Sequence, residues 1–167
     1  MGEKIVLLIT GAFGASAGKI IGIFIIAMIP IIELRGAIPV AFAMGLNWQT
    51  AMICSIAGNL LPIPFILLFL NGIFNFMKKH NIFKNFVIWL EEKGRKNSGK
   101  VEKYGFWGLM IFVAIPLPGT GGWTGALIAS VMKMSKKNSL ISILLGVVIA
   151  SIVVTIITYG LVGRVIN

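Results

Sequence analysis

The sequence contains no aspartate, and its five glutamates stand against fifteen lysines and arginines. It also has a single cysteine, Cys54, and a single histidine, His80. A lone cysteine cannot form an internal disulfide, and neither residue has neighbours at metal-ligand spacing. No nucleophile stands beside a base in a known motif, and no redox motif is present. We therefore expect no metal, no cofactor and no enzymatic activity.

Charge is scarce overall, at 12% of residues, whereas soluble domains carry about a quarter. The chain is 57% hydrophobic and has a mean hydropathy of +0.97. We expect a single all-α integral membrane domain, multi-pass, in the cytoplasmic (inner) membrane. Most basic residues flank apolar segments, so the net charge of +10 favours contact with lipid headgroups over nucleic acid.

Four apolar blocks lie between the charge clusters, over residues 20–46, 48–77, 104–132 and 139–163. The second and fourth exceed the roughly 20 residues that a membrane-spanning helix needs, and a kink is expected in the second near Asn59, Pro62 and Pro64. The first and third are interrupted, and their halves are too short to span. Such halves suit re-entrant hairpins, with tips predicted near 31–36 and 117–122.

The polar connector at 78–103 carries eight basic residues against three acidic ones. Its apolar residues have helical spacing near 82–92, which predicts an amphipathic helix at the membrane surface. The positive-inside rule places this connector in the cytoplasm.

An internal repeat emerges at an offset of 86 residues. Residues 21–43 match 107–129 at six of 23 positions, including a shared Ile-Pro and a glycine six residues after the proline. We predict an inverted repeat, with one copy at about 20–77 and the other at about 104–163, each a re-entrant hairpin followed by a transmembrane helix. The alternative is a chance match between two kinked apolar segments.

Glu33 and Arg35 are the only charged residues between residues 20 and 77. A charge inside a bilayer is costly unless it is paired or hydrated, so these residues mark a candidate site. Arg35 offers a planar fork to a phosphate or carboxylate. Glu33 can exchange a proton, which suits proton coupling, or can bind a cation. The alternative is a hairpin at the membrane surface with both charges solvated.

The second tip, "IPLPGTGGWTG", carries no charge. Its glycines free backbone amides at the start of a half-helix near Trp123, and such amides favour an anion. The alternative is a tight, unreactive turn. Besides Glu33 and Arg35, the candidate substrate-binding residues are Asn59, Gly119, Thr120, Gly121, Gly122, Trp123 and Thr124.

Four stretches carry a family resemblance: "PIIELRGAIPVAFAMGLN", "GNLLPIPFILLFL", "EKYGFWGLMIFVAIPLPGTGGWTGALIAS" and "LLGVVIASIVVTIITYG". Together they resemble the small multidrug export protein family of bacteria and archaea. More remotely, the broken hairpin and helix resemble the DedA/VTT-like membrane proteins. That resemblance implies movement of lipids, including undecaprenyl phosphate, by membrane-embedded acidic and arginine residues. Glu33 and Arg35 fit these roles by position, whereas the second hairpin lacks such charges.

The leading hypothesis is a membrane transporter or flippase that moves a lipid-linked phosphate, specifically undecaprenyl phosphate, with Glu33 coupling to protons. A proton-coupled exporter of small lipophilic cations is the alternative, and a non-transporting membrane scaffold is the third. The expected partners are membrane lipid and protons, and the sequence is compatible with a homodimer.

Overall fold

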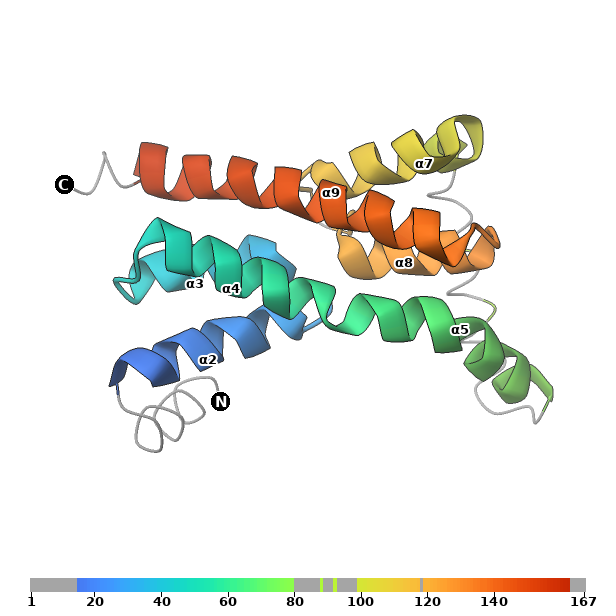
Figure 1. The fold of residues 1–167 in the computed structure, drawn as a ribbon, viewed down its shortest axis with the longest axis horizontal. Coiled ribbons are helices and arrows are strands. Elements are labelled where there is room, and N and C mark those ends of the chain that lie inside the picture. The colour runs from blue at the N-terminus through green and yellow to red at the C-terminus, as the bar shows by residue number, and fades with distance from the viewer. Residues whose placement is uncertain (1–14, 80–87, 89–91, 93–98, 118, 163–167) are drawn as a thin grey trace. The chain divides into compact units, whose positions relative to one another are not determined.

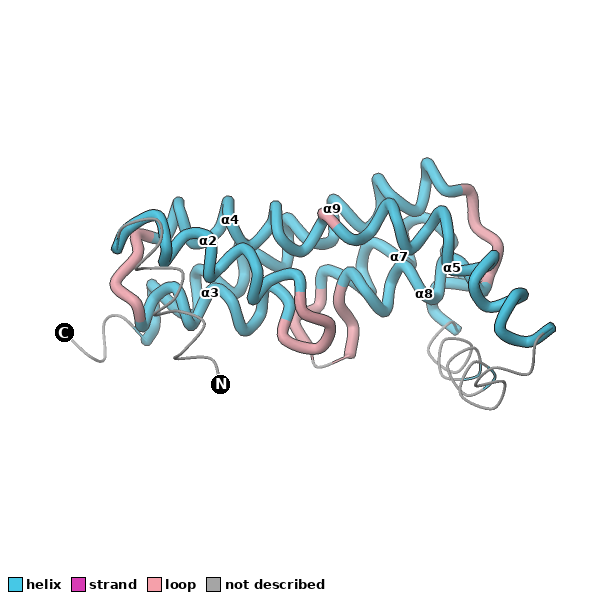
Figure 2. Tube along the Cα trace, turned by 90° about the horizontal axis from the view of Figure 1, so that it is seen from below, coloured by secondary structure: helices cyan, strands magenta, loops and turns pink. Residues whose placement is uncertain are grey.

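The computed structural model describes residues 15–79, 88, 92, 99–117 and 119–162. In this part of the chain, helices are joined by short turns and no residue lies in a strand (Figure 2). The elements are α2 (Ala15–Met28), α3 (Glu33–Ala43), α4 (Trp48–Leu60), α5 (Pro62–Lys79), α7 (Gly99–Ala114), α8 (Gly122–Val131), α9 (Lys136–Thr155) and the π-helix η1 (Ile156–Val162). The all-helical class is confirmed. The predicted surface helix near 82–92 lies outside the described residues, apart from residues 88 and 92.

Two helical stretches, Trp48–Leu70 and Lys136–Leu161, are long and apolar enough to cross a membrane. They coincide with the second and fourth apolar blocks. The first of them is interrupted by a turn at Leu61, as the prolines that follow predict. The chain divides into two compact units, residues 1–61 with 148–167 and residues 62–147.

In the first unit, α2 and α3 form a helical hairpin, and both helices pack against α4 (Figure 1). The break between them covers residues 29–32, slightly before the predicted tip at 31–36. The helix resumes early because the Glu33 amide donates to the Ile29 carbonyl and the Gly36 amide donates to the Ile32 carbonyl, both at 3.0 Å. The two charged residues therefore lie in the first turn of α3 and not in the connecting turn.

Small side chains allow the helices of the first unit to approach closely. Ala27, Ala37, Ala41 and Ala51 are buried together around Ile23. A Cβ atom placed on Gly58 of α4 would clash with the backbone carbonyl of Phe24 on α2. This contact therefore requires a glycine.

In the second unit, α7 and α8 form the other helical hairpin, and α8 packs against α5. The break covers residues 115–121, and α8 begins one residue before the expected Trp123. A Cβ on Gly125 of α8 would lie 2.6 Å from Cγ2 of Val113 on α7, so a glycine lets the two helices of this hairpin approach closely. The Ser142 hydroxyl of α9 donates to the Phe106 carbonyl of α7 at 2.6 Å.

Both hairpins end in the same way. The last turn of α3 is closed by Gly45, at φ +72°, and the Leu46 amide donates to the Ala41 carbonyl at 3.0 Å. The last turn of α8 is closed by Lys133, at φ +53°, and the Met134 amide donates to the Ala129 carbonyl at 2.9 Å. This is the Schellman pattern in both cases. The opposite orientation of two repeats, and their entry into a membrane, stay predictions.

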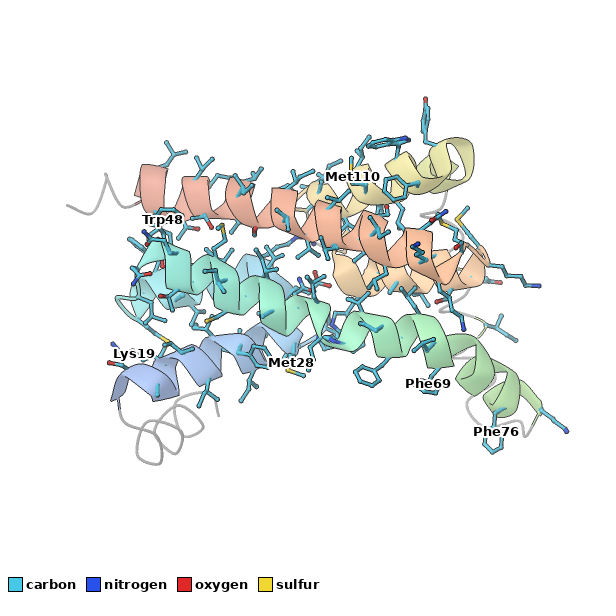
Figure 3. The ribbon with its side chains drawn as sticks, in the orientation of Figure 1. Lys19, Met28, Trp48, Phe69, Phe76 and Met110 are labelled. Atoms are coloured by element: carbon cyan, nitrogen blue, oxygen red, sulfur yellow. The ribbon has the colours of Figure 1, made fainter. Side chains whose placement is uncertain are left out.

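Large apolar side chains are exposed along α5. Phe65, Leu68, Phe69 and Phe76 are each more than half exposed, and Figure 3 shows Phe69 and Phe76 projecting from the helix. A contiguous apolar face of this kind is unfavourable in water and suits contact with lipid.

Candidate functional site

The charged pair lies at the start of α3. Glu33 is 4% exposed and Arg35 is half-buried. The carboxylate of Glu33 acts electrostatically on the guanidinium of Arg35. A buried charge is tolerated when an opposite charge lies nearby, so each residue lowers the cost of burying the other.

The backbone at this break has an uncommon conformation. Ile31 has φ +81° and Glu33 has φ +49°. Positive φ is uncommon for residues other than glycine, and it is a clear outlier for a β-branched side chain. Ile31 is 96% exposed, so no burial of its side chain offsets this strain. Strained backbone of this kind is concentrated at functional sites.

Asn59 is fully buried near the end of α4, the helix that packs against α3. Ser55 lies one turn earlier on the same face and is also fully buried. Among the described residues, the side-chain amide of Asn59 has no hydrogen-bond partner at its nitrogen or its oxygen. The Ser55 hydroxyl has none either. Buried polar atoms of this kind are normally satisfied by water or by a bound molecule.

The second tip is a compact turn. Gly119 has φ +83°, which glycine adopts without strain. The Thr120 hydroxyl lies 2.7 Å from the Ile115 carbonyl and 2.8 Å from the Leu117 carbonyl, so its proton is committed to the turn. Thr120 stays a predicted substrate-binding residue, and its hydroxyl is bonded within the turn.

The first turn of α8 follows directly. Gly121 is the N-cap and provides no side chain to cap the helix. Gly121 and Gly122 are buried, while Trp123 and Thr124 are half-buried. The predicted site residues thus fall into two groups. Glu33, Arg35 and Asn59 belong to the first unit, and the residues from Gly119 to Thr124 belong to the second.

Sequence reasoning missed a groove in the first unit. It has a volume of about 440 Å³ and is lined by Trp48, Met52, Ile152, Thr155, Ile156, Tyr159 and Gly160. Figure 3 shows Trp48 at the start of α4, beside the C-terminal part of α9. The fourth apolar block was expected to be a plain membrane span. The sequence feature that could have indicated the groove is the pair Thr155 and Tyr159 in this block. These two polar residues have the i, i+4 spacing that places them on one helix face.

The family model described as "Putative small multi-drug export protein" matches residues 33–153. The match begins at Glu33, the first residue of α3, includes the second helix break and extends into the C-terminal part of α9. No curated protein and no solved structure matches the chain.

Proposed function

We propose that this chain, which belongs to the small multi-drug export protein family, moves an amphipathic molecule across the cytoplasmic membrane in a step coupled to protons. Membership rests on a match over well over half of the chain. The two long apolar helices and the family together make it a membrane protein. A multi-pass arrangement in the inner membrane is part of the proposal.

The observation that carries the proposal is the burial of Glu33 beside Arg35 at a strained helix break. A scaffold needs neither a buried charge nor a strained turn, and both cost stability. An ionisable residue within an apolar segment is by default a candidate functional site, and acidic residues of this kind serve as proton relays.

The pair supports an anionic headgroup as the transported charge. While Glu33 is ionised, its carboxylate and an incoming phosphate compete for the same guanidinium. Protonation of Glu33 neutralises the carboxylate and leaves Arg35 as the positive group that binds phosphate through its fork. Proton loss on the other side of the membrane restores the competition and expels the phosphate. We therefore place a lipid-linked phosphate, such as undecaprenyl phosphate, first among the substrates.

Asn59 would assist. Among the residues that the structure describes, its side-chain amide has no hydrogen-bond partner, so it can donate to a phosphate oxygen. Binding of an anion at the start of α8, where the N-cap Gly121 has no side chain, is a separate prediction for the second unit.

Export of a small lipophilic cation is the second candidate, and the family description favours it. In that mechanism the ionised Glu33 binds the cation, and a proton displaces it. The charge of Arg35 opposes this binding, which is why the cation is placed second.

The test uses purified protein in liposomes with an imposed pH gradient. One arm follows a fluorescent polyprenyl phosphate with a membrane-impermeant quencher, and the other follows tetraphenylphosphonium. We expect pH-dependent flipping of the phosphate lipid, which Arg35→Lys slows about tenfold or more because one charged hydrogen bond of the fork is lost. Glu33→Gln should remove the pH dependence, since glutamine cannot titrate.

Glu92→Gln is the matched control, because Glu92 is exposed and lies outside both helix breaks. Its rates should equal those of the wild type. Movement of the phosphonium ion alone, with loss in Glu33→Gln, would favour the second candidate. Wild-type rates and pH response in both Glu33→Gln and Arg35→Lys would disprove the assignment of the site.

A further inference from the structure

Two helices of the second unit run side by side in the same direction. The Ser142 hydroxyl of α9 donates to the Phe106 carbonyl of α7 at 2.6 Å, and a Cβ on Gly146 of α9 would meet the Met110 carbonyl of α7. Residue numbers therefore rise together along the two helices, so α7 and α9 are parallel within this unit. Because α9 follows α8 after a short turn, the start of α7, the start of α9 and the end of α8 lie at one end of the unit.

This end of the unit is strongly basic. We call it the basic end, and it consists of residues 104–107 at the start of α7 and residues 131–139 around the turn from α8 into α9. No acidic residue follows Glu102 in the sequence, so none of these residues carries a negative charge. Three lysines of the turn are exposed, namely Lys133, Lys136 and Lys137.

The three lysines occupy positions that helix stability does not favour. Lys133 closes the last turn of α8 at φ +53°, whereas Gly45 closes the matching turn of the first hairpin at φ +72°. Glycine adopts positive φ without strain, and lysine does not. Lys136 and Lys137 lie in the first turn of α9, where the partial positive charge of the helix N-terminus repels cations and no acidic residue offsets it. An anion beside the turn would reduce this repulsion.

Exposed aromatic side chains lie at the same end. Tyr104 is 56% exposed and Trp107 is 62% exposed. Between them Gly105 interrupts α7 at φ +52° and ψ −118°, so the chain changes direction there. Since Phe106 is level with Ser142, the lysines in the first turn of α9 lie roughly 8 Å further out along the unit. This is the order of a membrane interface, where aromatic rings lie at the edge of the acyl chains and lysines extend to the headgroups.

We infer that the basic end lies in the headgroup layer of the membrane and binds the phosphate groups of anionic phospholipids through Lys133, Lys136 and Lys137. A surface rich in anionic lipid attracts every lysine near it, and a lipid phosphate is a strong acceptor for an ammonium group. The part of α7 that follows Gly105 ends at Ala114, which gives about 13 Å of helix. That length carries the second break to about the middle of a hydrocarbon core of roughly 30 Å.

The inference does not depend on the substrate of the charged pair, which belongs to the other unit. It would hold whether that pair binds a phosphate, binds a cation or does neither. It requires only that the second unit lies in a membrane.

The first test measures which lipids remain bound to the purified full-length protein. The detergent micelles contain equal amounts of phosphatidylglycerol, which is anionic, and phosphatidylcholine, which is not, and native mass spectrometry counts the bound lipids. We expect a preference for phosphatidylglycerol. Replacing all three lysines together (Lys133→Gln, Lys136→Gln and Lys137→Gln) should lower this preference about tenfold or more, because each lysine near an anionic surface contributes about fivefold.

The matched control keeps the three charges, with Lys133→Arg, Lys136→Arg and Lys137→Arg, and it should keep the preference. No preference in the wild type, or the same preference in the glutamine variant, would overturn the inference. Release of the lipid by millimolar glycerophosphoglycerol, which is the headgroup without acyl chains, would indicate a site for a free phosphate ester and would also overturn it.

Thermal unfolding in nanodiscs separates lipid binding from a structural role of the lysines. A lipid that binds only the folded protein raises its melting temperature. In phosphatidylcholine alone, the glutamine variant should melt no lower than the wild type, because the three positions do not favour lysine. Phosphatidylglycerol should raise the melting temperature of the wild type and the arginine variant, and much less that of the glutamine variant. A glutamine variant that melts lower in phosphatidylcholine alone would assign the lysines to the fold, and the inference would be wrong.

Tryptophan fluorescence tests the depth of the basic end in the membrane. Two single-tryptophan proteins keep either Trp107 or Trp123, which lies in the first turn of α8 beside the second break, and phenylalanine replaces the other three tryptophans. Each protein is placed in lipid that carries bromine, a quencher, near the headgroup or near the end of the acyl chain. Trp107 should be quenched more strongly by the shallow bromine and Trp123 by the deep bromine. Stronger quenching of Trp107 by the deep bromine would remove the basic end from the headgroup layer and overturn the inference.

Discussion

The two helix breaks of this protein solve the same geometric problem with different residues. The alignment at an offset of 86 sets Glu33, which directly follows the first break, against Gly119 of the second, and both have positive φ, at +49° and +83°. Glycine adopts this conformation freely, whereas glutamate is strained in it. The second break is closed by the hydroxyl of Thr120, and no charged residue lies in it. The first break instead combines strain with a buried carboxylate.

The difference indicates different roles. The second break uses residues that minimise the free energy of a turn, so its composition is explained by structure. At the equivalent point, directly after the first break, the buried and strained Glu33 raises the free energy of the fold. A requirement beyond folding accounts for that residue, which is why we place the transported charge and the proton at the first break.

The largest effect on stability is expected from the charged pair. Arg35→Leu would remove the positive charge of α3 and leave the Glu33 carboxylate buried. We expect the free energy of unfolding in detergent to fall by about 3 kcal/mol, the lower end of the range for breaking a buried pair. Adding Glu33→Gln should restore at least half of this loss. Thermal and denaturant unfolding of the two variants measure it. Equal stability of Arg35→Leu and wild type would mean that the pair contributes nothing to the fold.

The next effect compares one close glycine contact in each unit. A Cβ on Gly58 meets the backbone of Phe24, whereas a Cβ on Gly125 meets a side-chain methyl of Val113, which is displaced at a lower cost than backbone. We expect Gly58→Ala to lower the unfolding free energy by about 2–3 kcal/mol and Gly125→Ala by about 1 kcal/mol. Gly22→Ala is the control, because nothing lies within 4 Å of its Cβ position. A larger loss for Gly125→Ala would reverse the comparison.

Backbone strain gives a pair of opposite effects. Gly119→Ala would force alanine to φ +83°, and we expect a loss of about 1 kcal/mol. Ile31→Gly relieves the strain at φ +81° without removing a buried side chain, and we expect a gain of about 1 kcal/mol. Unfolding curves recorded under one set of detergent conditions reveal the two signs. Destabilisation by Ile31→Gly would show that the first break is not strained.

The smallest effect should come from the turn hydroxyl. Thr120→Val keeps the shape but loses the hydrogen bond to the Ile115 and Leu117 carbonyls, at a cost of about 1 kcal/mol. Thr120→Ser should recover most of this loss. Transport should stay at the wild-type rate in both variants if the Thr120 hydroxyl serves only the turn to which it is bonded. A transport defect without a stability defect would instead support the predicted role of Thr120 in substrate binding.

Local features of the sequence determined the class of the protein and the approximate location of its breaks. Apolar block length and the scarcity of charge predict membrane helices because the bilayer imposes a minimum length on any span. Pro62 and Pro64 predict the interruption at Leu61, since proline removes a helical hydrogen bond. Glu33 and Arg35 were identifiable as candidates because they are alone in a long uncharged stretch.

Only the tertiary structure decided which of these features matter in space. That Glu33 is buried, that Gly58 lies against Phe24, and that Thr155 faces Trp48 and Met52 across a groove depend on helices distant in sequence. The sequence made Thr120 a candidate substrate-binding residue, and only the structure shows that its hydroxyl bonds to carbonyls of its own turn. The periodicity of apolar residues predicts which face of a helix is buried. Which other helix covers that face is decided by how side chains pack in the folded chain. For this reason the sequence located the charged pair, whereas the groove became visible only in the folded chain.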